Sequence, residues 1–147
     1  MTQITEKILE RKAYLDTNIF IYAVEENPTF LKIVTEVLSV IKSSNYIPIT
    51  SELSLSELLV KPIQNKDKLL QNVYEKQIQT SKVLEVLPVN REILRAAASI
   101  RAQLKIKLPD SIHVATAEVS NCDVFVCNDK GIRVPKNMER IVLNDYL

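Results

Sequence analysis

The chain has 147 residues, of which 19 are basic and 18 acidic, and its net charge of +1 excludes nucleic-acid binding through bulk charge. Gly131 is the only glycine, which excludes the glycine-rich loops that bind nucleotide phosphates. His113 is the only histidine, and two cysteines are too few for a zinc ribbon, so the common zinc sites are excluded as well. Carboxylate, hydroxyl and amine groups remain for catalysis.

The N-terminus is polar and of mixed charge, unlike a signal peptide, and the apolar runs are too short to cross a bilayer. Cys122 and Cys127 lie among apolar neighbours, which is typical of small core residues in a reducing compartment. We therefore expect a cytoplasmic protein with no membrane segment. Its length suits a single domain over residues 1–147 that buries a core without disulfides.

Apolar periodicity divides the chain into alternating strands and helices. Residues 1–11 are expected to form a short helix or a loose arm. Predicted strands occupy residues 12–16, 46–50, 82–86 and 123–127, with 140–143 as a candidate fifth. Predicted helices occupy residues 17–25, 28–45, 51–60, 65–79, 90–107 and 109–121. We expect Pro62 to stop or kink the helix before it, and residues 128–131 to form a turn.

Strands that alternate with helices imply βαβ crossovers, and hence a mostly parallel sheet with helices on both faces. The predicted fold class is therefore α/β, a three-layer α/β/α sandwich around a mostly parallel sheet of four to five strands. In open sheets of this kind, ligands bind outside the carboxyl ends of the strands.

Four acidic residues are predicted to gather at that end of the sheet. Asp16 ends the first strand and Asp129 follows the fourth; if these two strands are neighbours in the sheet, their ends lie about 4.8 Å apart. Glu57 lies one to two turns into the helix after the second strand, and Asp110 opens the helix before the fourth. Pro109 suits the first turn of that last helix, whose positive end faces Asp110.

Each acid also has a purely structural interpretation. Asp16 and Asp110 would cap their helices. Glu57 would complete a capping box with Ser54, and Asp129 would be an ordinary turn residue. Gathered without a partner, however, the four carboxylates would repel one another and raise their own pKa values. A divalent cation bound by Asp16, Asp110 and Asp129 would relieve this repulsion, and oxygen ligands alone suit Mg²⁺ or Mn²⁺.

Such a site suits the hydrolysis of phosphodiesters, because one or two hard cations can activate a water and stabilise the leaving oxygen. Four polar residues beside the acids would orient ligands or water, or serve in turns and caps: Thr17, Asn18, Ser51 and Asn128. His113 follows Asp110 by three residues on one helical face. We expect a partly buried structural histidine; the alternative is a proton donor to the leaving group.

Four segments carry a resemblance to a known family: LDTN at residues 15–18, SELSLSELL at 51–59, LPDSIHVATA at 108–117 and ND at 128–129. Over nearly the whole chain, the sequence resembles the PIN domain, and in length and spacing the small VapC-like toxins of prokaryotic toxin–antitoxin pairs. The resemblance implies an α/β/α sandwich with strand order 3-2-1-4-5 and a Mg²⁺- or Mn²⁺-dependent endoribonuclease. Asp16, Glu57, Asp110 and Asp129 match the family's acidic positions.

The same resemblance implies three partners: an RNA substrate, an antitoxin protein and a second copy of the toxin in a homodimer. The chain departs from many relatives at Cys127, where they have Thr or Ser before the last acid pair. This departure concerns a supporting hydroxyl and not the metal site.

Four basic residues form a stripe about 120° wide on the helix predicted at 90–107: Arg91, Arg95, Arg101 and Lys105. The stripe is either a solvated helix face or a contact for the RNA backbone.

Three other functions compete with the nuclease. A non-catalytic RNA- or protein-binding module of the same fold would not need all four acids. A phosphatase of the haloacid dehalogenase type would need a D-x-D motif, but the segment Asp16-Thr17-Asn18 lacks the second acid. A phosphoreceiver domain would need an acid at the end of its third strand, where the chain offers only Glu85.

Overall fold

A computed structural model describes all residues, 1–147, and contains one five-stranded sheet. The strands are β1 (Ala13–Leu15), β2 (Ile49–Ser51), β3 (Glu85–Leu87), β4 (Val124–Cys127) and β5 (Glu139–Val142). All neighbouring pairs are parallel, in the order β3-β2-β1-β4-β5. The predicted α/β fold, the parallel sheet, the fifth strand and the order 3-2-1-4-5 are therefore confirmed.

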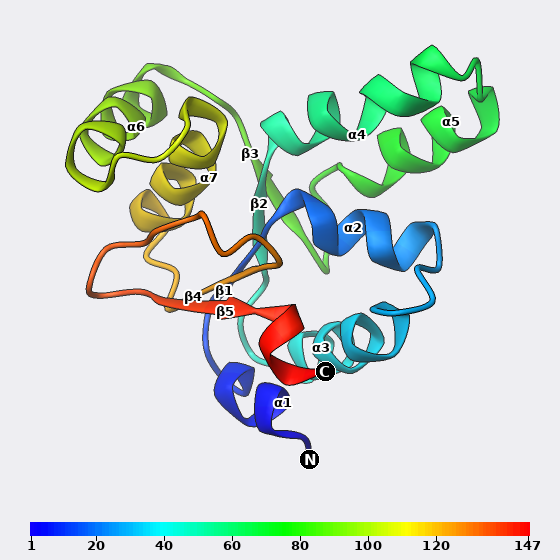
Figure 1. The fold of residues 1–147 in the computed structure, drawn as a ribbon, viewed down its shortest axis with the longest axis horizontal. Helices are drawn as coiled ribbons and strands as arrows, with labels where there is room; N and C mark the ends of the chain where they lie inside the picture. The colour runs from blue at the N-terminus through cyan, green and yellow to red at the C-terminus, as the bar shows by residue number, and fades with distance from the viewer.

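Seven α-helices and a short 3-10 helix connect and cover the strands (Figure 1). They are α1 (Gln3–Ile8), α2 (Thr17–Val24), α3 (Leu31–Ser43), α4 (Glu52–Gln64), α5 (Lys68–Gln77), α6 (Arg91–Leu104), α7 (Leu108–Val119) and η1 (Leu143–Tyr146). Figure 1 shows α6 and α7 on one side of the sheet and α2 to α5 on the other. No helix combines the length and apolar content needed to span a membrane.

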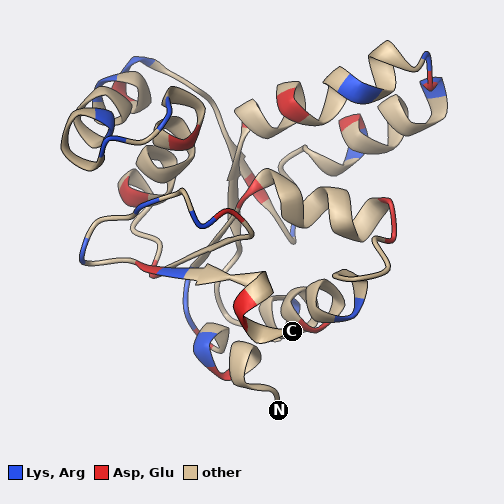
Figure 2. Ribbon diagram, in the orientation of Figure 1, with Lys and Arg blue, Asp and Glu red and all other residues tan.

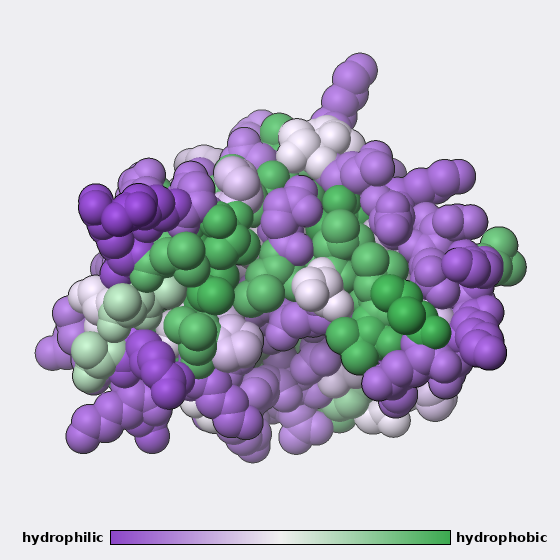
Figure 3. All heavy atoms as spheres, turned by 90° about the horizontal axis from the view of Figure 1, so that it is seen from above, coloured by the Kyte–Doolittle hydropathy of each residue, from purple (hydrophilic) through white to green (hydrophobic).

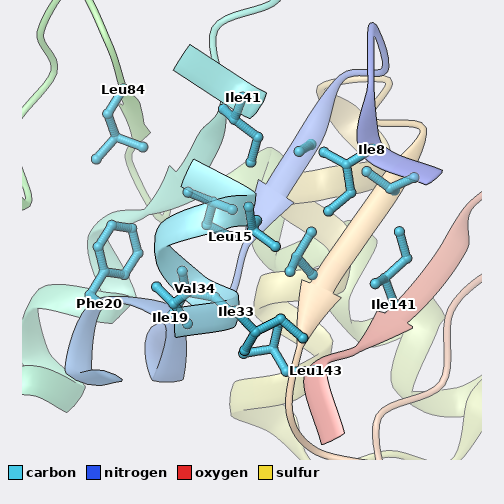
Figure 4. Packing of buried hydrophobic residues seen from close by; sticks show 14 of the residues in the cluster. Ile8, Leu15, Ile19, Phe20, Ile33, Val34, Ile41, Leu84, Ile141 and Leu143 are labelled. Carbon is cyan, nitrogen blue, oxygen red and sulfur yellow. The ribbon is translucent and has the colours of Figure 1, made fainter. Parts of the chain in front are cut away.

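The two helical layers bury two separate hydrophobic cores, because successive side chains of a strand point to opposite faces. Ala13 and Leu15 of β1 belong to the core beneath α1 to α5, whereas Tyr14 between them belongs to the core beneath α6 and α7. Figure 4 shows the first core, where Leu15 lies among side chains of α2 and α3 such as Ile19 and Val34. β1 is thus packed on both faces, which suits a central strand of a parallel sheet.

The pairing of β1 with β4 sets the position of the candidate site. Leu15 lies opposite Val126, and the backbone N–H of Asp16 donates to the Val126 carbonyl over 3.0 Å. The residue that follows β1 is therefore fixed beside the end of β4. This arrangement confirms the prediction that the first and fourth strands are neighbours.

Several helix boundaries differ from the predicted ones. Pro62 does not stop its helix, which continues to Gln64, because a proline in the last turn removes only one of the few remaining backbone hydrogen bonds. The predicted helix 90–107 ends at Leu104, because Lys105 adopts a left-handed conformation with φ of 55°. The helix predicted at 65–79 begins only at Lys68, since the side chain of Asp67 caps it.

Candidate functional site

Asp16 lies at the N-cap position of α2, directly after β1, yet its side chain makes no capping hydrogen bond. The residue is buried, with 7% of its surface exposed. The capping interpretation of Asp16 is therefore wrong: the backbone turns into the helix here, but the carboxylate makes no capping hydrogen bond, and only the backbone N–H of the adjacent Thr17 lowers its pKa by hydrogen bonding. A buried carboxylate with so few hydrogen-bond donors is costly to keep ionised.

The surroundings of Asp16 raise its pKa to about 6, mainly through burial. His113 and the backbone N–H of Thr17 lower this pKa, while the nearby charges of Glu57 and Asp110 raise it further. His113 Nε2 lies 3.8 Å from Asp16 Oδ1. The electrostatics therefore place Asp16, Glu57, Asp110 and His113 in one neighbourhood, although they come from distant parts of the sequence. Figure 2 shows acidic segments at the starts of α2 and α7, on α4 and in the loop after β4.

Glu57 lies well inside α4, so the capping-box interpretation with Ser54 is wrong. The helix begins earlier than that pattern requires, and Ser51 is its N-cap, accepting a bond from the Leu53 amide over 3.0 Å. The Glu57 carboxylate instead crosses to neighbouring elements: its Oε1 accepts from Thr17 Oγ1 at 2.7 Å and lies 2.6 Å from His113 Nε2. Burial alone would raise the pKa of Glu57, but the bonds from His113 and Thr17 lower it.

His113 is more buried than expected, with 1% of its surface exposed. Its Nδ1 lies 2.6 Å from the hydroxyl of Tyr14, and its Nε2 faces Glu57. Burial alone would lower the pKa of His113, but the hydrogen bond to Glu57 and the charge of Asp16 raise it. The sequence indicated the shared helical face with Asp110 but not the two partners, because Tyr14 lies 99 residues away and Glu57 56 residues away.

Asp110 is the third residue of α7 and lies in its first turn, and the N-cap position belongs to Lys107, which makes no side-chain capping hydrogen bond. Burial raises its pKa, and the charge of Asp129 raises it further. Asp129 is exposed, and its Oδ1 accepts from the Gly131 amide over 2.8 Å. The turn interpretation of Asp129 is thus confirmed, while its effect on Asp110 shows that the two carboxylates also lie in the same field.

The four acidic side chains offer donor atoms that suit a hard cation such as Mg²⁺ or Mn²⁺. All are oxygen donors, the carboxylates of Asp16 and Asp110 accept no bond from another side chain beyond the long contact to His113, and their negative charges disfavour one another. In this conformation, however, no three His, Cys, Asp or Glu side chains are close enough together to hold a metal ion. The cavities of about 300, 430 and 520 Å³ are lined by other residues. Asp16, Glu57, Asp110 and Asp129, called the acid cluster below, thus line none of these cavities.

The four polar residues predicted beside the acids have different roles. Thr17 contacts Glu57 as described and lies 3.0 Å from the buried hydroxyl of Ser54, a contact that no sequence pattern indicated. Asn18 is half-buried and makes no side-chain hydrogen bond. Ser51 caps α4, and Asn128 bonds Tyr22 and the backbone of Asn144 over 3.0 and 2.9 Å. Only Thr17 therefore touches one of the four acids.

The basic stripe divides into two parts in the structure. Arg91 and Arg95 are exposed in the first half of α6 and form no ion pair or side-chain hydrogen bond. Arg101 Nη1 instead donates to the Ile106 carbonyl over 3.0 Å, and Lys105 forms the left-handed C-cap. The second pair thus serves the end of the helix, and contact with RNA remains a prediction for the stripe.

Comparisons with known proteins agree with this architecture. Residues 13–137 match the family profile of the PIN domain. Among solved structures, a DNA-bound VapBC from Salmonella typhimurium is 20% identical, with a TM-score of 0.63, and the match covers 90% of this chain and 98% of that one. A toxin–antitoxin complex from Klebsiella pneumoniae is 17% identical, with a TM-score of 0.65 and coverage of 90% and 98%.

A third structure, VapC20 of Mycobacterium tuberculosis, is described as a toxin that cleaves the sarcin-ricin loop. It is 13% identical, with a TM-score of 0.64 and coverage of 78% of this chain and 87% of that one. At these identities the likeness concerns the fold, and no curated protein sequence matches the chain. The family match, by contrast, spans most of the sequence, and with it all four acids. The chain belongs to the PIN domain family.

Proposed function

We propose that this chain is a Mg²⁺- or Mn²⁺-dependent endoribonuclease, the toxin of a toxin–antitoxin pair. The observation that carries the proposal is the buried carboxylate of Asp16, whose pKa is raised to about 6 beside the charges of Glu57 and Asp110. A structural acid gains nothing from such surroundings, because they disfavour its charged form. A bound cation makes the charge favourable, and catalytic sites are where such arrangements concentrate.

Asp16, Asp110 and Asp129 would hold the metal. When bound, it would lower the pKa of a water molecule and neutralise charge on the phosphodiester. Glu57 is assigned a different role from these three, since His113 and Thr17 both form hydrogen bonds with its Oε1. Its Oε2 makes no hydrogen bond, and the side chain is 36% exposed. Glu57 is therefore placed to accept a proton from the attacking water, a role for which its lowered pKa keeps it ionised.

The open position of the acids suits a polymer rather than a small substrate. Glu57 and Asp129 are both exposed, and three cavities of about 300, 430 and 520 Å³ lie elsewhere. Arg91 and Arg95 are free cations on α6, which packs against the helix that carries Asp110. We propose that they contact RNA phosphates, which would position the backbone without reading its sequence.

We also propose that the chain binds an antitoxin and a second copy of itself in the cytoplasm. The solved relatives include complexes described as VapBC and as toxin–antitoxin. Figure 3 views the molecule from the top of Figure 1 and shows two apolar areas, one on the side of α6 and α7 and one on the side of α4 and α5. Large apolar side chains are exposed on these helices: Val60, Ile63, Leu69, Val73, Leu94 and Leu108. Exposed apolar patches of this kind are typical of protein interfaces.

The proposal is tested with purified protein and single-stranded RNA. We expect cleavage inside the RNA chain with Mn²⁺ or Mg²⁺ and none in EDTA. Asp16→Asn should lose most of the activity, because it removes a charge from the metal site. Asp67→Asn is the matched control, since Asp67 also stands at a helix N-cap, where asparagine caps equally well. Undiminished cleavage in EDTA would refute the metal mechanism, and RNA binding without cleavage would favour the non-catalytic module.

A further inference from the structure

We infer that His113 is a positioning residue, which holds the Glu57 carboxylate in place through a chain of hydrogen bonds that begins at the buried Tyr14. The consequence for catalysis rests on the proposed nuclease function, whereas the chain of bonds itself does not. It runs from β1 through α7 to α4, so it joins three elements that meet only in the folded protein.

The direction of the bond between His113 and Glu57 follows from chemistry. Glu57 is a carboxylate, because its pKa is lowered, and a carboxylate can only accept hydrogen bonds. The Nε2 of His113, at 2.6 Å, must therefore carry a proton and donate it to Oε1. This holds for the neutral imidazole with its proton on Nε2 and for the imidazolium alike. The donor role of Nε2 thus does not depend on the charge of His113.

The other side of the ring is fixed by Tyr14. Its hydroxyl lies 2.6 Å from Nδ1, and the residue is completely buried. The Tyr14 ring also meets the imidazole edge-on at 5.8 Å between centroids and stacks on Phe125 of β4 at 5.0 Å. A ring held at both nitrogens and packed on one edge has a single orientation. His113 is therefore a rigid donor, which a solvent-exposed side chain could not be.

Glu57 needs such a donor, because its own side chain is long and partly exposed. The bonds from His113 and from Thr17 converge on the same oxygen, Oε1, and leave Oε2 without a partner. Two fixed donors on one oxygen define where the other oxygen points. The geometry thus leaves a single Glu57 oxygen free to act, in the arrangement by which a second group orients a catalytic one.

The bond can be observed without any assay of activity, because His113 is the only histidine of the chain. In a ¹⁵N-labelled sample, every imidazole signal therefore belongs to this residue. We expect a low-field, slowly exchanging Nε2–H proton in the metal-free wild type. This signal should be lost in Glu57→Ala. It should be kept in Tyr74→Phe, a control that removes a different hydrogen bond of a glutamate, the one between the hydroxyl of the buried Tyr74 and Glu25. An imidazole N–H that is unchanged in Glu57→Ala would refute the bond.

The effect on catalysis is tested by kinetics on folded variants at a temperature below their melting points. His113→Leu should lower kcat by about 10- to 100-fold, the usual loss when the partner of a catalytic group is removed, and should leave KM nearly unchanged. His113→Gln, whose amide nitrogen can replace Nε2 as a donor, should recover part of kcat. Tyr14→Phe should lower kcat less than His113→Leu, and Tyr74→Phe should not change it.

Combining His113→Leu with Glu57→Gln separates positioning from a general structural role. If His113 acts through Glu57, the double variant has the same kcat as Glu57→Gln alone. Independent, multiplying losses would contradict the inference, as would a full kcat in His113→Leu. If the wild type does not cleave RNA at all, the proposed function fails, and the imidazole N–H signal still decides whether the bond exists.

Discussion

Asp16 and Val126 are joined by a backbone hydrogen bond of 3.0 Å, which fixes the residue after β1 against the end of β4. The backbone at Asp16 is thus held between the end of β1 and the end of β4, where the residue is 7% exposed. Burial at this position is the main cause of the raised Asp16 pKa. The free energy that the pairing of β1 and β4 contributes to folding therefore offsets an unfavourable charge at the site.

The raised pKa of Asp16 predicts a pH-dependent cost in stability. The pKa is about 6 in the folded protein and 3.8 for an unperturbed aspartate, so the folded state binds the proton more tightly. The cost is absent below pH 3.8, grows as the pH rises, and is complete above about pH 6. Asp16→Asn removes it, so the variant should be more stable than the wild type at pH 7, by about 1 to 3 kcal/mol. At pH 4 most of this advantage should vanish.

Thermal melts in EDTA between pH 4 and pH 7.5 measure this difference. Asp67→Asn serves as the control, since Asp67 caps α5 at an exposed position, and its effect on the melting temperature should not follow the same course. An Asp16→Asn protein that is less stable than the wild type at pH 7 would show that the carboxylate stabilises the fold, contrary to the cost expected from its burial.

Metal binding should reverse the order of the two proteins. A ligand that binds only the native state stabilises it by about 2.7 kcal/mol at one hundred times its Kd. We expect Mn²⁺ to raise the melting temperature of the wild type and to shift Asp16→Asn far less, because one of the three proposed ligands is lost. Titration of Mn²⁺ into both proteins, followed by melting, tests this. Equal shifts in the two would remove Asp16 from the metal site.

Local patterns predicted the elements well, but the partners of the site residues depend on contacts between distant segments. β1 and β4 are buried throughout, so their apolar runs were sufficient to identify them. The strand order came from the resemblance to the PIN domain, not from periodicity. No local pattern could pair Tyr14 with His113, since that bond depends on α7 packing over β1.

Two errors show how local rules fail. Ser54 and Glu57 satisfy the spacing of a capping box, but the helix starts at Glu52, where the end of β2 and the Ser51 cap place it. The end of α6 was missed because Lys105 takes the left-handed conformation that usually indicates a glycine.

The left-handed conformation of Lys105 leads to a prediction about stability. Lys105→Gly should raise the free energy of unfolding by up to about 1 kcal/mol, because glycine adopts this conformation without steric cost. Urea unfolding measures it, and a destabilised variant would contradict this expectation.

The division of the basic stripe leads to a last prediction, in which two changes on one helix have opposite consequences. Arg91 and Arg95 have no partner in the fold, so replacing both by alanine should leave stability within about 0.5 kcal/mol. RNA binding should weaken by a similar factor for all sequences. The plot of the logarithm of the binding constant against the logarithm of the salt concentration should become less steep, by about two in slope.

Arg101→Ala is the matched change on the same helix. It removes the hydrogen bond to the Ile106 carbonyl, so it should lower the free energy of unfolding by about 1 kcal/mol and leave the salt slope unchanged. Fluorescence binding titrations at about 50 to 200 mM salt, together with urea unfolding of the three proteins, separate the two effects. If the Arg91 and Arg95 double variant binds RNA with the wild-type affinity and slope, these side chains are only solvated, and the RNA backbone must lie on another face of the acid cluster.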